Sequence, residues 1–154
     1  MYPVTISDQP ERLVTGCAHR DPYDQISTAY ATLGATLGAQ GLWPQVHDMV
    51  AVYFDDPDIL PPAEWRSLAG VVLAPGVPVP DGLETQVLPG GRHAVVEFNG
   101  PYAGLHDAYR WLYGDWLRAS GETPREAPAF EVYLNSPMDT APEDLRTDIY
   151  LPLA

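Results

Sequence analysis

The chain has 154 residues, with 21 acidic residues against 8 basic ones, all arginine, and a formal net charge of −13. Such a charge repels phosphate backbones and anionic lipid surfaces, which argues against direct nucleic-acid or membrane binding. A 45% hydrophobic content excludes a disordered chain, and one cysteine excludes an internal disulfide framework.

The first half of the chain predicts one helix between strands. A strand is expected from Arg12 to Cys17, and Asp21-Pro22 is typical of a helix start. Apolar residues then recur at spacings of three and four, which places them on one helix face: Ile26, Ala29, Tyr30, Leu33 and Leu37. Two further strands follow, at 49–54 and 70–73.

A proline- and glycine-rich connection, about residues 74–91, separates this half from a second one. Within it, 85–88 has the composition of a strand. The second half begins with a strand at 93–98, and Pro101-Tyr102 opens a helix. That helix again has one apolar face, made by Leu105, Ala108, Tyr109, Leu112 and Trp116. Strands at 130–135 and 148–151 complete the chain.

The two halves align at a shift of about 80 residues, so we interpret the chain as an internal duplication. The matched positions include Tyr30 with Tyr109 and Tyr53 with Tyr133. We expect one domain over 1–154, with half-repeats of about 1–74 and 83–154. The predicted fold is α+β: a duplicated βαββ unit with pseudo-two-fold symmetry, two helices on a mostly antiparallel sheet, and a central ligand cleft.

The repeat breaks at one position that carries chemistry. Glu131 lies in Phe130-Glu131-Val132-Tyr133-Leu134-Asn135, whose alternation predicts a strand with Phe130, Val132 and Leu134 on the core face. Glu131 aligns with Ala51, so only one half has a carboxylate there. A solvated strand face is one explanation; a buried acid in an aromatic cleft is the other.

An aromatic cleft with one carboxylate suits flat cationic or polar aromatic ligands. The candidate ligand-binding residues are Glu131, Tyr133, Tyr53, Ala51, Trp65, Tyr109 and Trp111. Core packing is the simpler role for Tyr30, Tyr109 and Trp116. The four histidines have no metal-ligand spacing, and we expect neither a metal site nor a cofactor.

The chain also resembles the GyrI-like family, which includes the DNA gyrase inhibitory protein and AraC-type effector-binding domains. The residues that carry the resemblance are Val50–Asp58, Phe130–Asn135, Gly100-Pro101-Tyr102, Trp111-Leu112-Tyr113 and Thr147–Leu153. The resemblance implies a duplicated βαββ unit around a hydrophobic pocket, with Glu131 as its central acid. It also implies a stand-alone member, since no helix-turn-helix segment accompanies the repeat.

Three functions follow from this resemblance. The first is binding of lipophilic, cationic or aromatic small molecules, as in multidrug-binding members, with Glu131 as the acidic anchor. The second is inhibition of DNA gyrase through protein contact. The third is hydrolysis of small electrophiles by Glu131 with Tyr133 or Tyr53. We rank binding above enzyme activity, and we expect a cytoplasmic protein because the N-terminus lacks a basic leader and no apolar run would span a bilayer.

Overall fold

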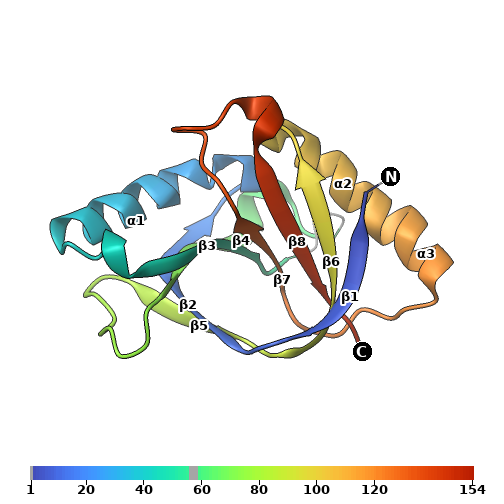
Figure 1. Ribbon diagram of the computed structural model, residues 1–154, viewed down its shortest axis with the longest axis horizontal. Helices are drawn as coiled ribbons and strands as arrows, with labels where there is room; N and C mark the ends of the chain where they lie inside the picture. Colours follow the sequence, from blue (N-terminus) through green and yellow to red (C-terminus); the bar gives the residue numbers. More distant parts are fainter. Residues whose placement is uncertain (1, 56–58) are drawn as a thin grey trace.

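The computed structural model describes residues 2–55 and 59–154, which form an α+β domain (Figure 1). The strands are β1 Val4–Gln9, β2 Arg12–Arg20, β3 Val46–Tyr53, β4 Arg66–Leu73, β5 Glu84–Leu88, β6 Gly91–Asn99, β7 Ala129–Tyr133 and β8 Arg146–Pro152. The helices are α1 Ser27–Ala39, α2 Leu105–Trp111 and α3 Leu117–Ser120, with a π-helical turn, Leu112–Trp116, joining α2 to α3. The end of the motif Val50–Asp58 lies outside the described residues.

The strands form one sheet in the order β1-β6-β8-β7-β3-β4-β2-β5, and every pairing between named strands is antiparallel. The second-half strands β6, β8 and β7 are contiguous, as are the first-half strands β3, β4 and β2. The halves meet where β3 pairs with β7. This arrangement confirms the predicted α+β class and the duplicated βαββ unit.

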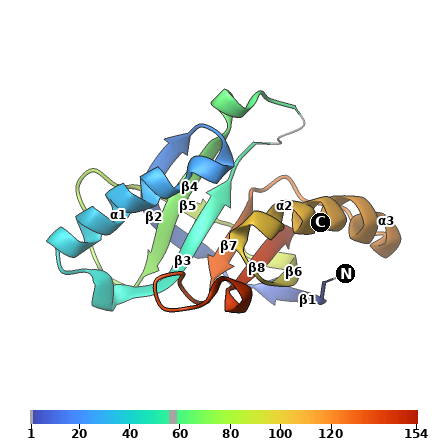
Figure 2. The ribbon, with the colours of Figure 1, turned by 90° about the horizontal axis from the view of Figure 1, so that it is seen from above.

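Both helical segments pack on the same face of the curved sheet (Figures 1 and 2). On α1 the residues Ala29, Leu33 and Leu37 recur every four positions and are buried, and α1 contacts β2 and β4. Ala108 and Leu112 anchor the second helical segment over β6 and β8. The opposite, concave face has its own core, which contains Phe130, Val132 and Tyr150.

The edge strands are exchanged between the halves. β1 precedes the first βαββ unit in the chain but pairs with β6 of the second, and β5 pairs with β2 of the first. The connection from β1 to β2 and the connection from β5 to β6 run side by side, since a Cβ atom on Gly90 would lie 2.8 Å from the Gln9 carbonyl oxygen. Each half therefore completes the sheet of the other.

The pseudo-two-fold axis passes between β3 and β7 at the position where the repeat breaks. In the register of this pair Ala51 lies opposite Glu131, Val50 opposite Val132, and Val52 opposite Phe130. Ala51 and Glu131, which the duplication relates, are thus directly opposite, whereas Val50 faces Val132, the counterpart of Val52, as a two-fold axis through residues 51 and 131 requires.

Three local predictions differ from the structure. β7 ends at Tyr133, and Leu134, expected on the core face, is 47% exposed. The first helix begins at Ser27, because Tyr23–Gln25 forms a separate 3₁₀ turn after Pro22. No strand is expected from the sequence over 4–9, where β1 forms, since an edge strand that pairs across the duplication has no local signal beyond a short alternation.

Close packing of β2 on β4 gives a stability prediction. A Cβ atom at Gly16 would overlap the Ala69 carbonyl oxygen, whereas one at Gly114 would meet no atom within 4 Å. We expect Gly16→Ala to lower the free energy of unfolding by about 1–3 kcal/mol, because the clash is with backbone. Gly114→Ala, the control, should leave it unchanged or raise it by up to about 1 kcal/mol. Urea denaturation measures both; equal stability of the two variants would contradict the prediction.

Candidate functional site

Glu131 is buried in the middle of β7, with 2% of its surface exposed. The alternation of the strand puts Phe130 and Val132 on the concave face, so Glu131 points to the face that carries the helices. The solvated-face explanation is therefore wrong for this residue.

Three tyrosine hydroxyls hold the carboxylate. Tyr53 on β3 and Tyr133 on β7 donate to Glu131 Oε1, at 3.1 and 2.8 Å. Tyr109 on α2 donates to Oε2 at 2.8 Å. No ion pair among the described residues includes Glu131. The carboxylate is thus satisfied by neutral donors from three separate elements and has no cation beside it there.

Further aromatic rings surround this cluster. Tyr23 lies 4.6 Å from Tyr53 and 4.9 Å from Trp65, measured between ring centroids. Tyr30 and Tyr102 contact the Tyr133 ring edge-on, at 6.1 and 5.5 Å. Tyr113 stacks on Tyr109 at 6.4 Å. Tyr102 and Tyr113 are 38% and 46% exposed and so form the outer side of the cluster.

Burial decides the ionisation of this cluster. It raises the pKa of the Glu131 carboxyl, and the hydrogen bonds from Tyr109, Tyr133 and Tyr53 oppose that rise only in part. Burial and the nearby charge of Glu131 also raise the pKa values of Tyr53, Tyr109 and Tyr133. The tyrosines therefore remain neutral hydrogen-bond donors at physiological pH.

The structure brings together most of the candidate residues. Glu131 accepts hydrogen bonds from Tyr53, Tyr109 and Tyr133, and Ala51 lies opposite it on β3. Trp65 is one ring further away, because it packs on Tyr23, which contacts Tyr53. Trp111 instead packs edge-on against Tyr2 at 5.3 Å. Two positions along a helix turn a side chain by about 200°, so Tyr109 and Trp111 cannot face the same way. A ligand contact for Trp111 stays a prediction.

Tyr23, Tyr102 and Tyr113 were not among the predicted site residues. Tyr23 and Tyr102 had a usable signal, because both follow a proline and they align in the two halves. With Tyr30/Tyr109 and Tyr53/Tyr133, they make three tyrosine pairs around a single carboxylate. Tyr113 has no counterpart of this kind, but it follows Tyr109 by four positions, which places both on one helix face, and it stacks on Tyr109.

The two halves use an equivalent tyrosine differently. Tyr109 donates to Glu131, whereas its counterpart Tyr30 donates to the Val50 carbonyl oxygen at 2.9 Å. The first half has Ala51 in place of the carboxylate, so the backbone next to Ala51 supplies the acceptor. The aromatic framework is close to symmetric, and the charge is not.

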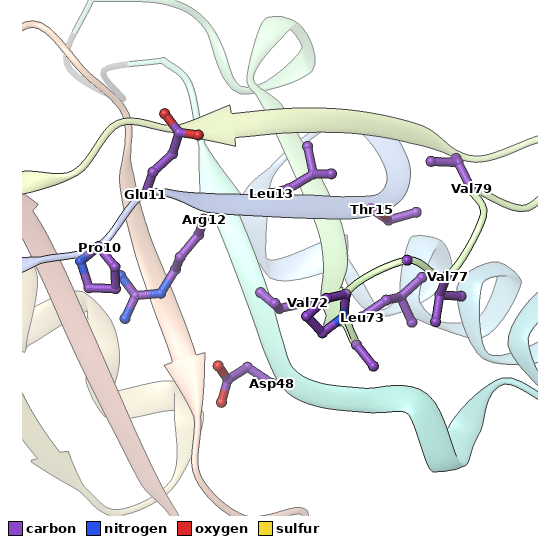
Figure 3. Close-up of a pocket in the computed structure, with 13 residues that line it drawn as sticks. Pro10, Glu11, Arg12, Leu13, Thr15, Asp48, Val72, Leu73, Val77 and Val79 are labelled. Carbon is purple, nitrogen blue, oxygen red and sulfur yellow. The ribbon is translucent and has the colours of Figure 1, made fainter.

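A cavity of about 450 Å³ lies elsewhere, on the concave face (Figure 3). Its walls include Arg12, Asp48, Val72 and Val79. Figure 3 shows Arg12 and Leu13, neighbours on β2, pointing to opposite sides of the strand. The Arg12 guanidinium lies over the Phe130 and Tyr150 rings, at 5.2 and 4.9 Å, so β7 separates this cavity from Glu131.

Within residues 2–55 and 59–154, no three His, Cys, Asp or Glu side chains gather as metal ligands. No helix in that part of the chain is long and apolar enough to cross a membrane.

Comparison with known proteins identifies the family. The model of the GyrI-like small molecule binding domain matches residues 2–154. The chain belongs to the GyrI-like family. The probable transcriptional regulator YgiV of Escherichia coli K12 is 31% identical over 98% of this chain and 96% of its own length. The DNA gyrase inhibitor of Yersinia enterocolitica is 35% identical over 57% of this chain and 59% of its own.

Solved structures share this GyrI-like fold. The C-terminal domain of EcmrR superposes with a TM-score of 0.78 at 17% identity, covering 100% of this chain and 98% of that one. SAV2435, solved bound to tetraphenylphosphonium, superposes with a TM-score of 0.66 at 15% identity, covering 99% and 94%. At these identities the likeness concerns the fold.

The raised pKa of Glu131 makes the stability of this GyrI-like domain depend on pH. Folding disfavours the ionised carboxylate, so the wild type loses stability as pH rises from about 4, the ordinary range of a glutamate, through the raised folded pKa. Glu131→Gln cannot ionise. We therefore expect the free energy of unfolding of the wild type to fall relative to that of Glu131→Gln as pH rises from about 4 to 7. Urea denaturation at each pH measures the difference, and a difference that grows in favour of the wild type would contradict this assignment.

Proposed function

We propose that this protein binds lipophilic cationic or aromatic small molecules, with Glu131 as the acidic anchor. The observation that carries the proposal is the burial of one carboxylate among tyrosines without a counter-ion in the described residues. Tyr133, Tyr53, Tyr109 and Trp65 supply aromatic surface, and Ala51 keeps the opposite half uncharged.

A buried carboxylate without a cation is electrostatically incomplete. Removal from water disfavours its charge, as the raised pKa of Glu131 records, and hydrogen bonds from neutral groups compensate only partly. A bound cation would supply the missing charge in a region of low dielectric, where the attraction is stronger than in water. Aromatic rings add a favourable environment for a cation, because their faces carry partial negative charge.

The comparisons support the same class of ligand. The family is described as a small molecule binding domain, and the related SAV2435 was solved with tetraphenylphosphonium, a lipophilic cation. Hydrolysis by Glu131 would need a carboxylate oxygen within reach of water, whereas both oxygens accept tyrosine hydrogen bonds in a buried site. This geometry favours binding over catalysis. A cytoplasmic location remains part of the proposal.

Tetraphenylphosphonium is the probe for this proposal. We expect saturable binding to the wild type by calorimetry, and Glu131→Gln should weaken it at least about tenfold, or ~1.4 kcal/mol, because the compensating charge is lost. Asp148→Asn is the matched control. It removes one negative charge from a residue opposite Val132 on β8, hence on the concave face, and should change the affinity less than about twofold.

Circular dichroism of both variants is the check that they fold. Equal affinity in the wild type and Glu131→Gln would overturn the anchor role. An equal loss in both variants would mean that net charge, not the buried carboxylate, attracts the probe.

A second candidate function is inhibition of DNA gyrase, which the Yersinia relative favours by its name and its 35% identity. The strongly acidic surface would suit a basic face on a protein partner. If this function holds, the purified protein inhibits gyrase supercoiling in a concentration-dependent way, and Glu131→Gln inhibits equally because the buried residue is not on the contact surface. No inhibition at a large molar excess of the protein would exclude it.

A further inference from the structure

We propose that the Glu131 site selects cations that carry no N–H donors, such as quaternary ammonium and phosphonium groups, over primary ammonium groups of the same charge. The inference rests on the proposed function and specifies the ligand class. It follows from how the structure presents the negative charge: through tyrosine rings rather than through a free carboxylate oxygen.

The carboxylate has little acceptor capacity left. Its two oxygens offer about four lone-pair positions, and three are taken by Tyr53, Tyr133 and Tyr109, at 2.8 to 3.1 Å. With Glu131 only 2% exposed, the remaining position on Oε2 lies behind the rings. A ligand that reaches the cluster from outside meets tyrosines before it meets the carboxylate.

The carboxylate acts on a ligand through the tyrosine rings that it polarises. A phenol that donates a hydrogen bond to a carboxylate is polarised, and its ring becomes a better partner for a cation. Tyr53, Tyr109 and Tyr133 are only partly buried, yet their hydroxyls point inward to a buried group. The rings, not the hydroxyls, are therefore the parts that face away from Glu131, and they contact further aromatic rings: Tyr23, Tyr30, Tyr102 and Tyr113.

This arrangement treats two kinds of cation differently. A primary ammonium has three N–H donors, and in water all three are hydrogen-bonded. Among the tyrosine rings most of these donors would have no acceptor. Each donor left without an acceptor weakens binding, because its hydrogen bond to water is lost and not replaced. To recover a hydrogen bond it would have to displace a tyrosine from Glu131. A quaternary cation has no donor to satisfy and keeps the three tyrosine bonds intact.

The outer rings mark where such a ligand approaches. Tyr102 and Tyr113 are the more exposed members, and they lie against Tyr133 and Tyr109, two of the three donors to Glu131. Tyr102 precedes α2, and Tyr113 lies in the π-helical turn after it. A cation at either ring would be separated from the carboxylate by one hydrogen-bonded tyrosine, Tyr133 or Tyr109.

The test compares benzyltrimethylammonium with benzylammonium, which have the same ring and, near neutral pH, the same charge. We expect the wild type to bind the trimethyl compound at least about tenfold more tightly. Three methyl groups also add apolar contact, so this ratio alone is not decisive. Tyr109→Phe separates the effects, because it frees Glu131 Oε2 to accept an N–H and leaves the methyl contacts in place.

Tyr109→Phe should therefore lower the ratio of the two affinities by at least about fivefold, mainly through tighter benzylammonium binding. Tyr150→Phe, which removes a hydroxyl on the concave face, is the control and should leave the ratio unchanged. An unchanged ratio in Tyr109→Phe, or no saturable binding of benzyltrimethylammonium to the wild type, would overturn the selectivity.

The proposed function is judged separately. If the benzyl compounds bind equally but Glu131→Gln still weakens tetraphenylphosphonium, the anchor role stands and the selectivity fails. If tetraphenylphosphonium binding does not depend on Glu131, the proposed function fails as well.

Discussion

The buried carboxylate of Glu131 is the constraint on which the centre of this domain depends. Its three hydrogen bonds come from β3, β7 and α2, so they tie both halves of the sheet and one helix to a single group. A carboxylate at this depth is tolerated only because each bond is made. The three tyrosines are consequently fixed in place before any ligand arrives, which limits the entropy lost on binding.

The duplication explains why there is one carboxylate and not two. The axis places residue 51 opposite Glu131, and directly opposed residues in an antiparallel pair have Cβ atoms about 4.5–5.5 Å apart. A glutamate at both positions would put two buried acids in contact, and one would stay protonated. A strict repeat is therefore incompatible with a charged centre, and Ala51 resolves the conflict. Tyr30, left without a carboxylate, bonds the Val50 carbonyl instead.

How far the sequence predicts this site depends on the kind of signal. The repeat and its break make Glu131, Ala51, Tyr53 and Tyr133 candidates for the site, because symmetry relates positions without reference to packing. Trp111 has the chemistry of a ligand contact, but it lies two helical positions from Tyr109 and so points in a different direction. The burial of Glu131 depends on both helices covering one sheet face. The pairing of β1 with β6 and of β5 with β2 joins segments that are far apart in sequence. Neither the burial nor these pairings can be predicted from a local sequence pattern.

The concave face shows how the same chain accommodates a cation that does carry N–H donors. Arg12 lies over the stacked Phe130 and Tyr150 rings, and it also donates to the Gln9 side-chain oxygen at 3.1 Å. There an amide acceptor accompanies the rings. Around Glu131 the acceptor atoms are already occupied by tyrosine hydroxyls. The two faces of β7 thus differ in what surrounds their aromatic rings: an amide acceptor beside a guanidinium on the concave face, and an occupied carboxylate on the other.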